Sequence, residues 1–265
     1  MKLKPVTGKS SIRLDDSDAR IRTGMSEAEC ERASAKYTGR ISELQRVLYA
    51  DARHAVLIIL QGRDASGKDG TIRRVFRAVN PQGCHVASFK APTELEQHHD
   101  FLWRVHGQVP ARGMIGIFNR SHYEDILVPR VHETVSKKVW SARYDQVNDF
   151  ESMLAANDVI ILKFFLHISR DEQKRRLVDR LTDPEKNWKF RAGDLDDRAL
   201  WDDFSKAYHG ILANTSTKAA PWYIVPADDK DVRDLLVART IADRLAKLHL
   251  RYPPADASIL GLEVT

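Results

Sequence analysis

The fold of this chain is decided by one stretch, His54-Ala-Val-Leu-Ile-Ile-Leu-Gln-Gly62-Arg-Asp64-Ala-Ser-Gly67-Lys68-Asp69-Gly70-Thr71-Ile-Arg-Arg74. Every residue from Val56 to Leu60 is Val, Leu or Ile, which is typical of a strand buried on both faces. A G-x-x-x-x-G-K loop follows, and apolar residues then recur at helical spacing until Asn80-Pro81. Strand, glycine loop and helix in this order form the pattern of a phosphate-binding P-loop. The alternative, a purely structural glycine loop, would not need these flanks.

Such a loop points backbone N–H groups and the positive end of a helix at one anion, while its lysine adds a point charge. We therefore expect Lys68 to bind phosphate, in a protein that handles phosphoryl groups. Asp69 stands where the common motif has the Ser or Thr whose hydroxyl holds Mg²⁺, so the metal must be held by other residues. The loop residues expected to contact phosphate or nucleotide are Gly62, Arg63, Ala65, Ser66, Gly67, Asp69 and Gly70.

Two carboxylates are candidate ligands for Mg²⁺. Asp64 should face the phosphates, which would repel it unless a cation lay between them, so it is a metal ligand or a base. The alternative is a turn-forming Asp satisfied by nearby N–H groups. A second apolar strand, 114–118, ends in Asn119, where P-loop enzymes usually have Asp, and a neutral amide brings no charge to a metal. Glu124 is the second candidate ligand, or an ordinary solvated carboxylate.

Arginines follow the same strand. Arg120 and Arg130 suit bidentate binding of phosphate, and we expect both to bind phosphate. A surface salt bridge is the alternative for either residue.

A run of cations spans a helix end and a loop interrupted by Asp183-Pro184. This placement suits a mobile lid that closes over phosphates and excludes water, whereas the alternative is a solvated charged face. Trp188 and Phe190, interleaved with the cations, argue against a purely solvated face. The cations are Arg175, Arg176, Arg180, Lys186, Lys189 and Arg191, of which we assign Arg175, Arg180, Lys189 and Arg191 to the lid.

Apolar runs alternate with amphipathic helices along the rest of the chain, which indicates an α/β fold with about five parallel strands and helices on both faces. We expect an extended basic arm over 1–25, one domain over 26–250 with its lid near 175–200, and a tail over 251–265. The arm is either a solubilising tail or a flap over an anionic ligand or a neighbouring subunit. The expected strands lie at 54–62, 86–90, 114–118, 159–168 and 222–226. The expected helices begin at the capping boxes Ser26/Glu29, Thr93/Glu96 and Ser169/Glu172, or span 144–154, 194–208 and 232–248.

The composition limits the partners. A net charge of +5 arises from 42 basic and 37 acidic residues, which suits a basic cleft better than a uniformly basic surface. Cys30 and Cys84 imply neither disulfides nor zinc, and no apolar segment approaches a membrane span, so we expect a cytoplasmic protein. The ten histidines lack metal spacing, and we expect polar helix or loop positions for His98, His99 and His122.

Several separated motifs together resemble polyphosphate kinase family 2, over roughly residues 26–250. They are Gly62-x-Asp64-x-x-Gly67-Lys68-Asp69-Gly70, Asn80-Pro81-x-Gly83, Phe89-Lys90-x-Pro92, Phe101-Leu-Trp103-Arg104-x-His106, Phe118-Asn119-Arg120-Ser121-x-Tyr123-Glu124-Asp125 and Trp188-Lys189-Phe190.

The resemblance implies a thymidylate-kinase-like P-loop kinase fold, Mg²⁺, a helical lid, and phosphoryl transfer between inorganic polyphosphate and a nucleotide. It also implies that Asp64 and Lys68 are the catalytic P-loop pair, followed by Arg120 after the second strand. Many members carry Asp where this chain has Asn119, and Asn119 together with Glu124 resembles the class III subgroup, which accepts AMP as well as ADP. The resemblance therefore favours adenine nucleotides as acceptors, with guanine nucleotides as further candidates.

We expect no nucleic acid or membrane partner, and a homodimer or homotetramer. Two other functions stay open. An ATP-dependent nucleoside monophosphate or small-molecule kinase has the same fold. A non-enzymatic polyanion- or nucleotide-binding protein is the third reading, against which the intact Asp64 and Lys68 argue.

Overall fold

The computed structural model describes residues 1–8, 11–259 and 262. Its centre is a five-stranded sheet with the order β2-β3-β1-β4-β5, in which all four pairings are parallel. This confirms the predicted parallel sheet. The strands are β1 (Ala55–Gly62), β2 (Cys84–Ser88), β3 (Ile115–Asn119), β4 (Val159–His167) and β5 (Trp222–Pro226).

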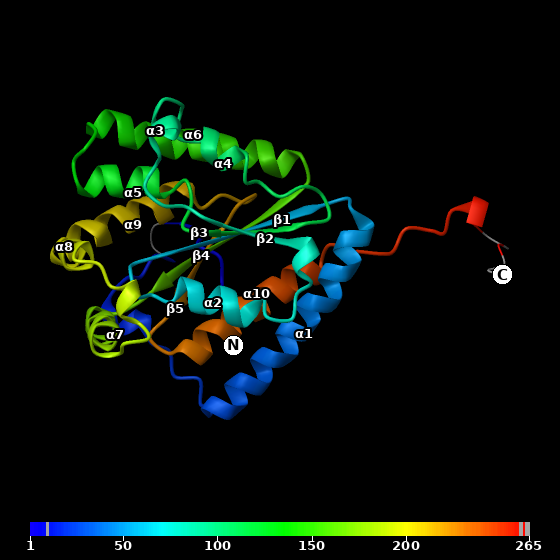
Figure 1. Cartoon of the computed structure of the whole chain (residues 1–265), viewed down its shortest axis with the longest axis horizontal. Coiled ribbons are helices and arrows are strands. Elements are labelled where there is room, and N and C mark those ends of the chain that lie inside the picture. Colours follow the sequence, from blue (N-terminus) through cyan, green and yellow to red (C-terminus); the bar gives the residue numbers. More distant parts are fainter. Residues whose placement is uncertain (9–10, 260–261, 263–265) are drawn as a thin grey trace.

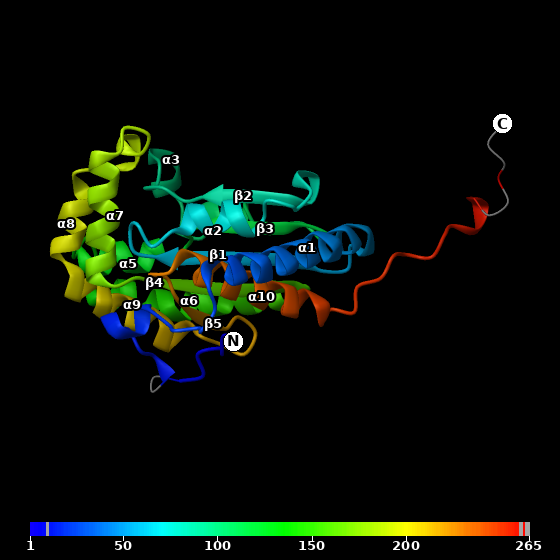
Figure 2. The same cartoon turned by 90° about the horizontal axis from the view of Figure 1, so that it is seen from below.

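Helices cover both faces of the sheet (Figure 1). One face packs against α1 (Glu27–Asp51), α2 (Lys68–Val75) and α10 (Lys230–Ala246), which Figure 2 shows from below. The other packs against α4 (Trp103–His106), α5 (Glu124–Val131), α6 (Lys137–Ala156) and α9 (Trp201–Thr215), and α3 (Glu94–Gln97) precedes α4. At one end of the sheet lie α7 (Arg170–Thr182) and α8 (Gly193–Ala199) (Figure 1).

The position of β1 at the centre of the sheet explains why residues 56–60 are all apolar and do not alternate with polar residues. All eight of its residues are buried. Val56, Ile58 and Leu60 pack into the core beneath α1, α2 and α10, whereas Leu57 and Ile59 pack into the core on the opposite face. A strand with helices on both sides needs apolar side chains at every position.

The capping boxes predicted at Ser26 and Thr93 are both present. The helix predicted after Thr93, however, is two short helices. The Asp100 carboxylate accepts a hydrogen bond from the Leu102 N–H, at 2.9 Å, and the Asp100 carbonyl accepts from Trp103. An aspartate that binds the backbone ahead of it starts a new turn rather than continuing a helix. The helix predicted from Asp194 through Tyr208 is likewise two helices, α8 and α9, which meet at Leu200.

Helix α5 was not predicted, because Pro129 lies inside it. Proline lacks the N–H that would bind the carbonyl four residues earlier, at Asp125. The Arg143 guanidinium of α6 donates to this carbonyl instead. A long-range contact thus replaces the missing helical hydrogen bond.

The N-terminal arm packs along the β5 edge of the sheet rather than standing free in solvent. The Val6 N–H donates to the Trp222 carbonyl at 2.8 Å, and the Asp228 N–H donates to the Ala19 carbonyl at 3.1 Å. Val6, Ile12 and Ala19 are buried. Residues 251–259 of the tail, in contrast, are exposed and extend away from the domain (Figures 1 and 2).

Cys30 and Cys84 are free thiols. Within the described part of the chain, no helix is both long enough and apolar enough to cross a membrane.

Candidate active site

The P-loop lies at the carboxyl end of the central strand β1, and Leu60 of this strand pairs with Asn119 at the end of β3. Ligands of open parallel sheets bind at this edge. The loop turns through left-handed backbone at Ala65 (φ 63°) and Gly67 (φ 102°). A Cβ on Gly67 would lie 2.0 Å from Nη1 of Arg233, so a larger residue would strain the left-handed backbone and displace this guanidinium group.

Lys68 is the first residue of α2, and its ammonium group folds back over the loop. Its Nζ donates to the carbonyls of Gly62 and Arg63, at 2.8 and 3.2 Å. Burial and the nearby charge of Arg120 lower the pKa of Lys68, although the surrounding carboxylates oppose this shift. A poorly solvated cation held at the mouth of the loop interacts strongly with an arriving anion.

Asp64, Arg120 and Glu124 form one cluster of charges beside Lys68. The Arg120 guanidinium lies 2.8 Å from Asp64 Oδ1 and 3.6 Å from Glu124 Oε2. Burial raises the pKa of Asp64, but the charges of Lys68, Arg120 and Arg180 outweigh it and leave the pKa below its usual value. Burial also raises the pKa of Glu124, where it prevails over Arg120 and Lys68. The structure therefore brings together the predicted catalytic residues and both predicted metal ligands.

The backbone of Arg120 is strained. Its φ of 62° lies in the left-handed region, which costs a non-glycine residue about 1 kcal/mol or more. The Arg120 N–H donates to the Leu60 carbonyl at 3.0 Å, and the Asn119 carbonyl accepts from the Phe89 N–H at 3.1 Å. These bonds hold a conformation that directs Arg120 toward Asp64 of the neighbouring loop.

Asn119 binds the P-loop helix through an amide. Its Nδ2 donates to Asp69 Oδ1 at 2.7 Å. An aspartate at position 119 would place a second carboxylate against Asp69, which like-charge repulsion disfavours. Asn119 and Asp69, the two positions where this chain differs from the common P-loop motif, are therefore complementary.

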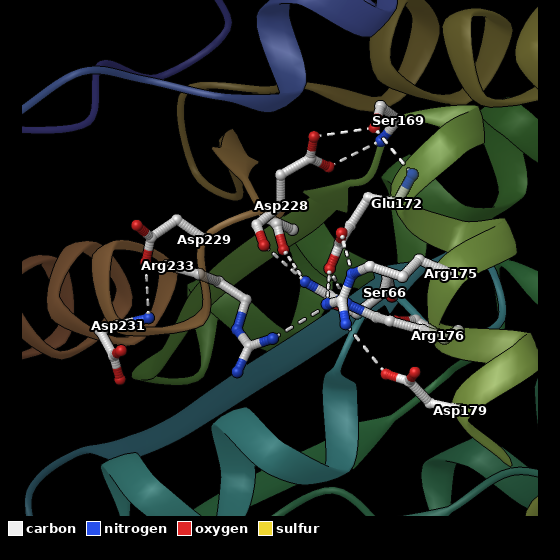
Figure 3. A network of polar contacts seen from close by, with 12 residues as sticks. Ser66, Ser169, Glu172, Arg175, Arg176, Asp179, Asp228, Asp229, Asp231 and Arg233 are labelled. Carbon is white, nitrogen blue, oxygen red and sulfur yellow. Dashed lines mark hydrogen bonds and ion pairs between the residues drawn. The ribbon is translucent and has the colours of Figure 1, made fainter. Parts of the chain in front are cut away.

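The carbonyls of the loop are held from behind by two buried arginines (Figure 3). Arg176 of α7 donates to the carbonyls of Ala65 and Ser66, at 2.9 and 3.2 Å, and Arg233 of α10 donates to Ser66 at 3.3 Å. Arg176 also donates to the carbonyls of Ala227 and Asp228, at 2.7 and 2.8 Å. Carbonyls that are bound from behind leave the loop rigid before any ligand arrives.

Arg176 belongs to the cationic run that suggested a lid, but it was not assigned to the lid, and the structure shows it buried beneath the P-loop. The sequence did carry a signal. Glu172, Gln173, Arg176 and Leu177 are the buried residues of α7, and their spacing places Arg176 on the same inner face as Leu177.

The four residues assigned to the lid lie in different places. Arg180 contacts Asp194 Oδ2 at 3.3 Å, and its positive charge helps to lower the pKa of Asp64. Arg175 instead lies 2.6 Å from Glu172 and 3.0 Å from Asp179 (Figure 3). Lys189 and Arg191 are exposed in the segment between α7 and α8.

Helix α8 adds carboxylates that the sequence reasoning missed. Burial and the negative charge of Asp64 raise the pKa of both Asp194 and Asp197. Helices α7 and α8 together therefore present both signs of charge to the site. Asp194 and Asp197 follow a long run of cations in the sequence, but their spacing of three residues is the signal that places both carboxylates on one face of a helix.

Arg63 and Arg130 are held by aromatic residues rather than by the charge cluster. The Arg63 guanidinium stacks on Trp201, 3.7 Å from the ring centroid, and donates to Ser205 Oγ at 2.6 Å. Arg130 donates to Tyr144 Oη at 2.9 Å and lies 4.6 Å from the ring centroid of Trp140.

The donor set near the P-loop suits a divalent cation that shares its ligands with phosphate. Asp64 and Glu124 supply hard carboxylate oxygens. No group of three or more His, Cys, Asp or Glu side chains within the described residues is placed to hold a metal ion. Mg²⁺ is usually bound by one or two carboxylates together with water and substrate phosphates, so a complete protein cage is not needed.

A parallel sheet, a P-loop after its central strand, a buried loop lysine and adjoining charged helices define a P-loop kinase fold. The family model described as "Polyphosphate kinase 2 (PPK2)" matches residues 24–252. The chain belongs to the polyphosphate kinase 2 family.

Relatives and a solved structure agree with this assignment. The chain is 50% identical over 246 residues to the "AMP/ADP-polyphosphate phosphotransferase" of Meiothermus ruber, covering 93% of this chain and 92% of that protein. It is 49% identical over 226 residues to the "ADP-polyphosphate phosphotransferase" of Rhodopseudomonas palustris, covering 81% and 78%. The crystal structure of polyphosphate kinase 2 from Arthrobacter aurescens TC1 superposes with a TM-score of 0.85 at 39% identity, covering 96% of this chain and 95% of that chain.

Proposed function

We propose that this chain transfers the terminal phosphoryl group of inorganic polyphosphate to AMP and to ADP, giving ADP and ATP. The observation that carries the proposal is the charge cluster of Asp64, Arg120 and Glu124 beside the buried Lys68. Phosphoryl transfer needs little covalent chemistry from a protein, and positioning with charge stabilisation suffices.

The roles of the side chains follow from their charges. Lys68 and the N–H groups of the loop bind the phosphoryl group that moves, and the Arg120 guanidinium donates to its oxygens. Asp64 and Glu124 would hold Mg²⁺, which when bound neutralises negative charge on the phosphates. In the free enzyme Arg120 is paired with both carboxylates, so its guanidinium is kept in place for a bound phosphate.

Two features support AMP as a second acceptor. AMP has one phosphate fewer than ADP, so an enzyme that uses both must hold the nucleotide in two registers. The uncharged Asn119, bound to Asp69, tolerates such a shift better than an aspartate fixed to one Mg²⁺ would. The relative from Meiothermus ruber is named for both acceptors, whereas the relative from Rhodopseudomonas palustris is named for ADP alone.

The proposal also includes a lid over the site, the cellular compartment and the oligomeric state. The exposed Lys189 and Arg191, with Arg180, would close over polyphosphate as a lid. We also propose a cytoplasmic enzyme that forms a homodimer or homotetramer, which light scattering after size-exclusion chromatography would measure.

The test supplies purified protein with Mg²⁺, long-chain polyphosphate and one acceptor at a time, AMP, ADP, GMP or GDP, without ATP. We expect ADP and ATP to form from AMP and ADP only when polyphosphate is present. In a separate reaction that contains ATP but no polyphosphate, phosphorylation of AMP would instead support an ATP-dependent kinase. If ADP reacted and AMP at millimolar concentration did not, the acceptor would be ADP alone.

A further inference from the structure

A closed polar cluster lies in the hydrophobic core behind the site. It consists of His122, Tyr123, Glu151 and Lys163, all of which are at most 1% exposed. Lys163 lies within the most apolar strand, β4. His122 lies in the turn between β3 and α5, a loop position as expected, but its side chain is completely buried. Phosphate transfer as described above uses none of these four side chains.

The hydrogen bonds of this cluster are satisfied almost completely. Lys163 Nζ donates to Glu151 Oε2 at 2.5 Å, and to Tyr123 Oη and the Thr215 carbonyl at 2.7 Å each. Tyr123 Oη donates to Glu151 Oε1 at 2.8 Å, and His122 Nε2 lies 3.3 Å from the same oxygen. Three acceptors match the three N–H groups of an ammonium ion, so Lys163 and Glu151 form a buried ion pair.

The cluster holds the segment that joins two site residues. Ser121, His122 and Tyr123 separate Arg120 from Glu124, and all three are buried. Ser121 Oγ accepts hydrogen bonds from Gln61 Nε2 at 3.1 Å and from the Tyr123 N–H at 3.2 Å. The side chains of all three residues between Arg120 and Glu124 are therefore held in the core. The side chains of Arg120 and Glu124, in contrast, lie beside the P-loop.

Stability alone gives no reason for such a cluster. Replacing a buried ion pair with apolar side chains of similar volume often leaves a protein equally stable or more so, although removing one partner is strongly destabilising. The strained backbone of Arg120, in contrast, needs surroundings that hold it.

We infer that Tyr123, Glu151 and Lys163 are positioning residues, whose buried network sets the relative placement of Arg120 and Glu124 for phosphoryl transfer. The inference rests on the proposed function. Because the network acts through the backbone of residues 121–123, its loss should lower kcat more than it changes substrate binding.

The first test compares Tyr123→Phe with the control Thr240→Val. Each variant loses one buried hydroxyl group, but Thr240 donates to the Leu236 carbonyl within α10, away from the cluster. We expect similar small losses of Tm, with kcat reduced roughly tenfold in Tyr123→Phe alone and the KM for ADP within about twofold of wild type. Equal kcat in both variants would overturn the inference.

The second test separates positioning from stability. Lys163→Met should lower Tm strongly because it leaves Glu151 buried and unpaired, whereas the double variant Lys163→Met/Glu151→Leu should recover Tm. Positioning predicts that kcat stays low in the double variant, and recovery of kcat together with Tm would show a purely structural role. Should wild type form no ATP from ADP and polyphosphate, the proposed function itself would fail.

Discussion

Lys68 is the single residue on which phosphoryl transfer should depend most directly. Its charge is buried and lies over the carbonyls of Gly62 and Arg63, so it interacts with phosphate more strongly than a solvated lysine would. We expect Lys68→Ala to lower kcat by about 10²–10³, as for loss of one preorganised donor. The control Lys206→Ala removes an exposed lysine that pairs with Asp203. Near wild-type turnover of Lys68→Ala would exclude the P-loop as the reaction centre.

Glu124 should lower the stability of the folded protein at neutral pH. Burial raises its folded-state pKa above the unfolded value, so the folded protein binds this proton more tightly than the unfolded chain does. The ionised carboxylate therefore destabilises the fold above the folded pKa, and this penalty disappears as pH falls below the unfolded value of about 4.3. Glu124→Gln should raise the free energy of unfolding at neutral pH, lose that gain in acid, and reduce activity.

Urea unfolding at neutral and acidic pH measures this gain, and the conservative exchange keeps the shape of the side chain. A Gln variant less stable than wild type at neutral pH would show that the attraction to Arg120 and Lys68 outweighs burial.

The segment that follows α7 belongs to the proposed lid, but helix α7 itself is fixed in place. Arg176 ties its middle to the P-loop and to the loop after β5, whereas residues 184–189 are exposed. Phosphates that satisfy the free cations should order only the segment after α7. We expect hydrogen exchange to be slow over 170–177 without ligand, and to slow over 183–191 when polyphosphate is added.

Peptides from the buried helix α10 serve as the control for this measurement, because their exchange should not respond to ligand. Unchanged exchange over 183–191, with polyphosphate binding verified by calorimetry, would leave this segment a solvated charged face.

The N-terminal arm contributes to the stability of the whole molecule. It covers the β5 edge through the Val6–Trp222 hydrogen bond and buries Val6 and Ile12. Burying two such side chains contributes about 3 kcal/mol or more, which corresponds to a change in Tm of roughly 10 °C. Deletion of residues 1–22 should lower Tm by this order, whereas deletion of residues 255–265 should leave it nearly unchanged. An unchanged Tm in calorimetry after deletion of residues 1–22 would show that the arm does not stabilise the fold.

Several features could be predicted from the sequence because they depend on neighbours in the chain. The all-apolar run of β1, the glycine loop and the capping boxes at Ser26 and Thr93 are local patterns, and each predicts its element without knowledge of the fold. The predicted strand before Asn119 is also present, and parallel strands place its carboxyl end at the same edge of the sheet as the P-loop.

Only the tertiary structure decided how similar residues are used, since charge and size alone do not say which side chain is buried. Arg176 holds loop carbonyls, Arg63 stacks on Trp201, and Lys189 is exposed, although all three are cations near predicted phosphate sites. Lys163 pairs with Glu151 only because β4 and α6 pack together. Contacts between distant segments decide which polar groups gain a hydrogen-bond or ion-pair partner. These contacts form only when the whole chain is folded.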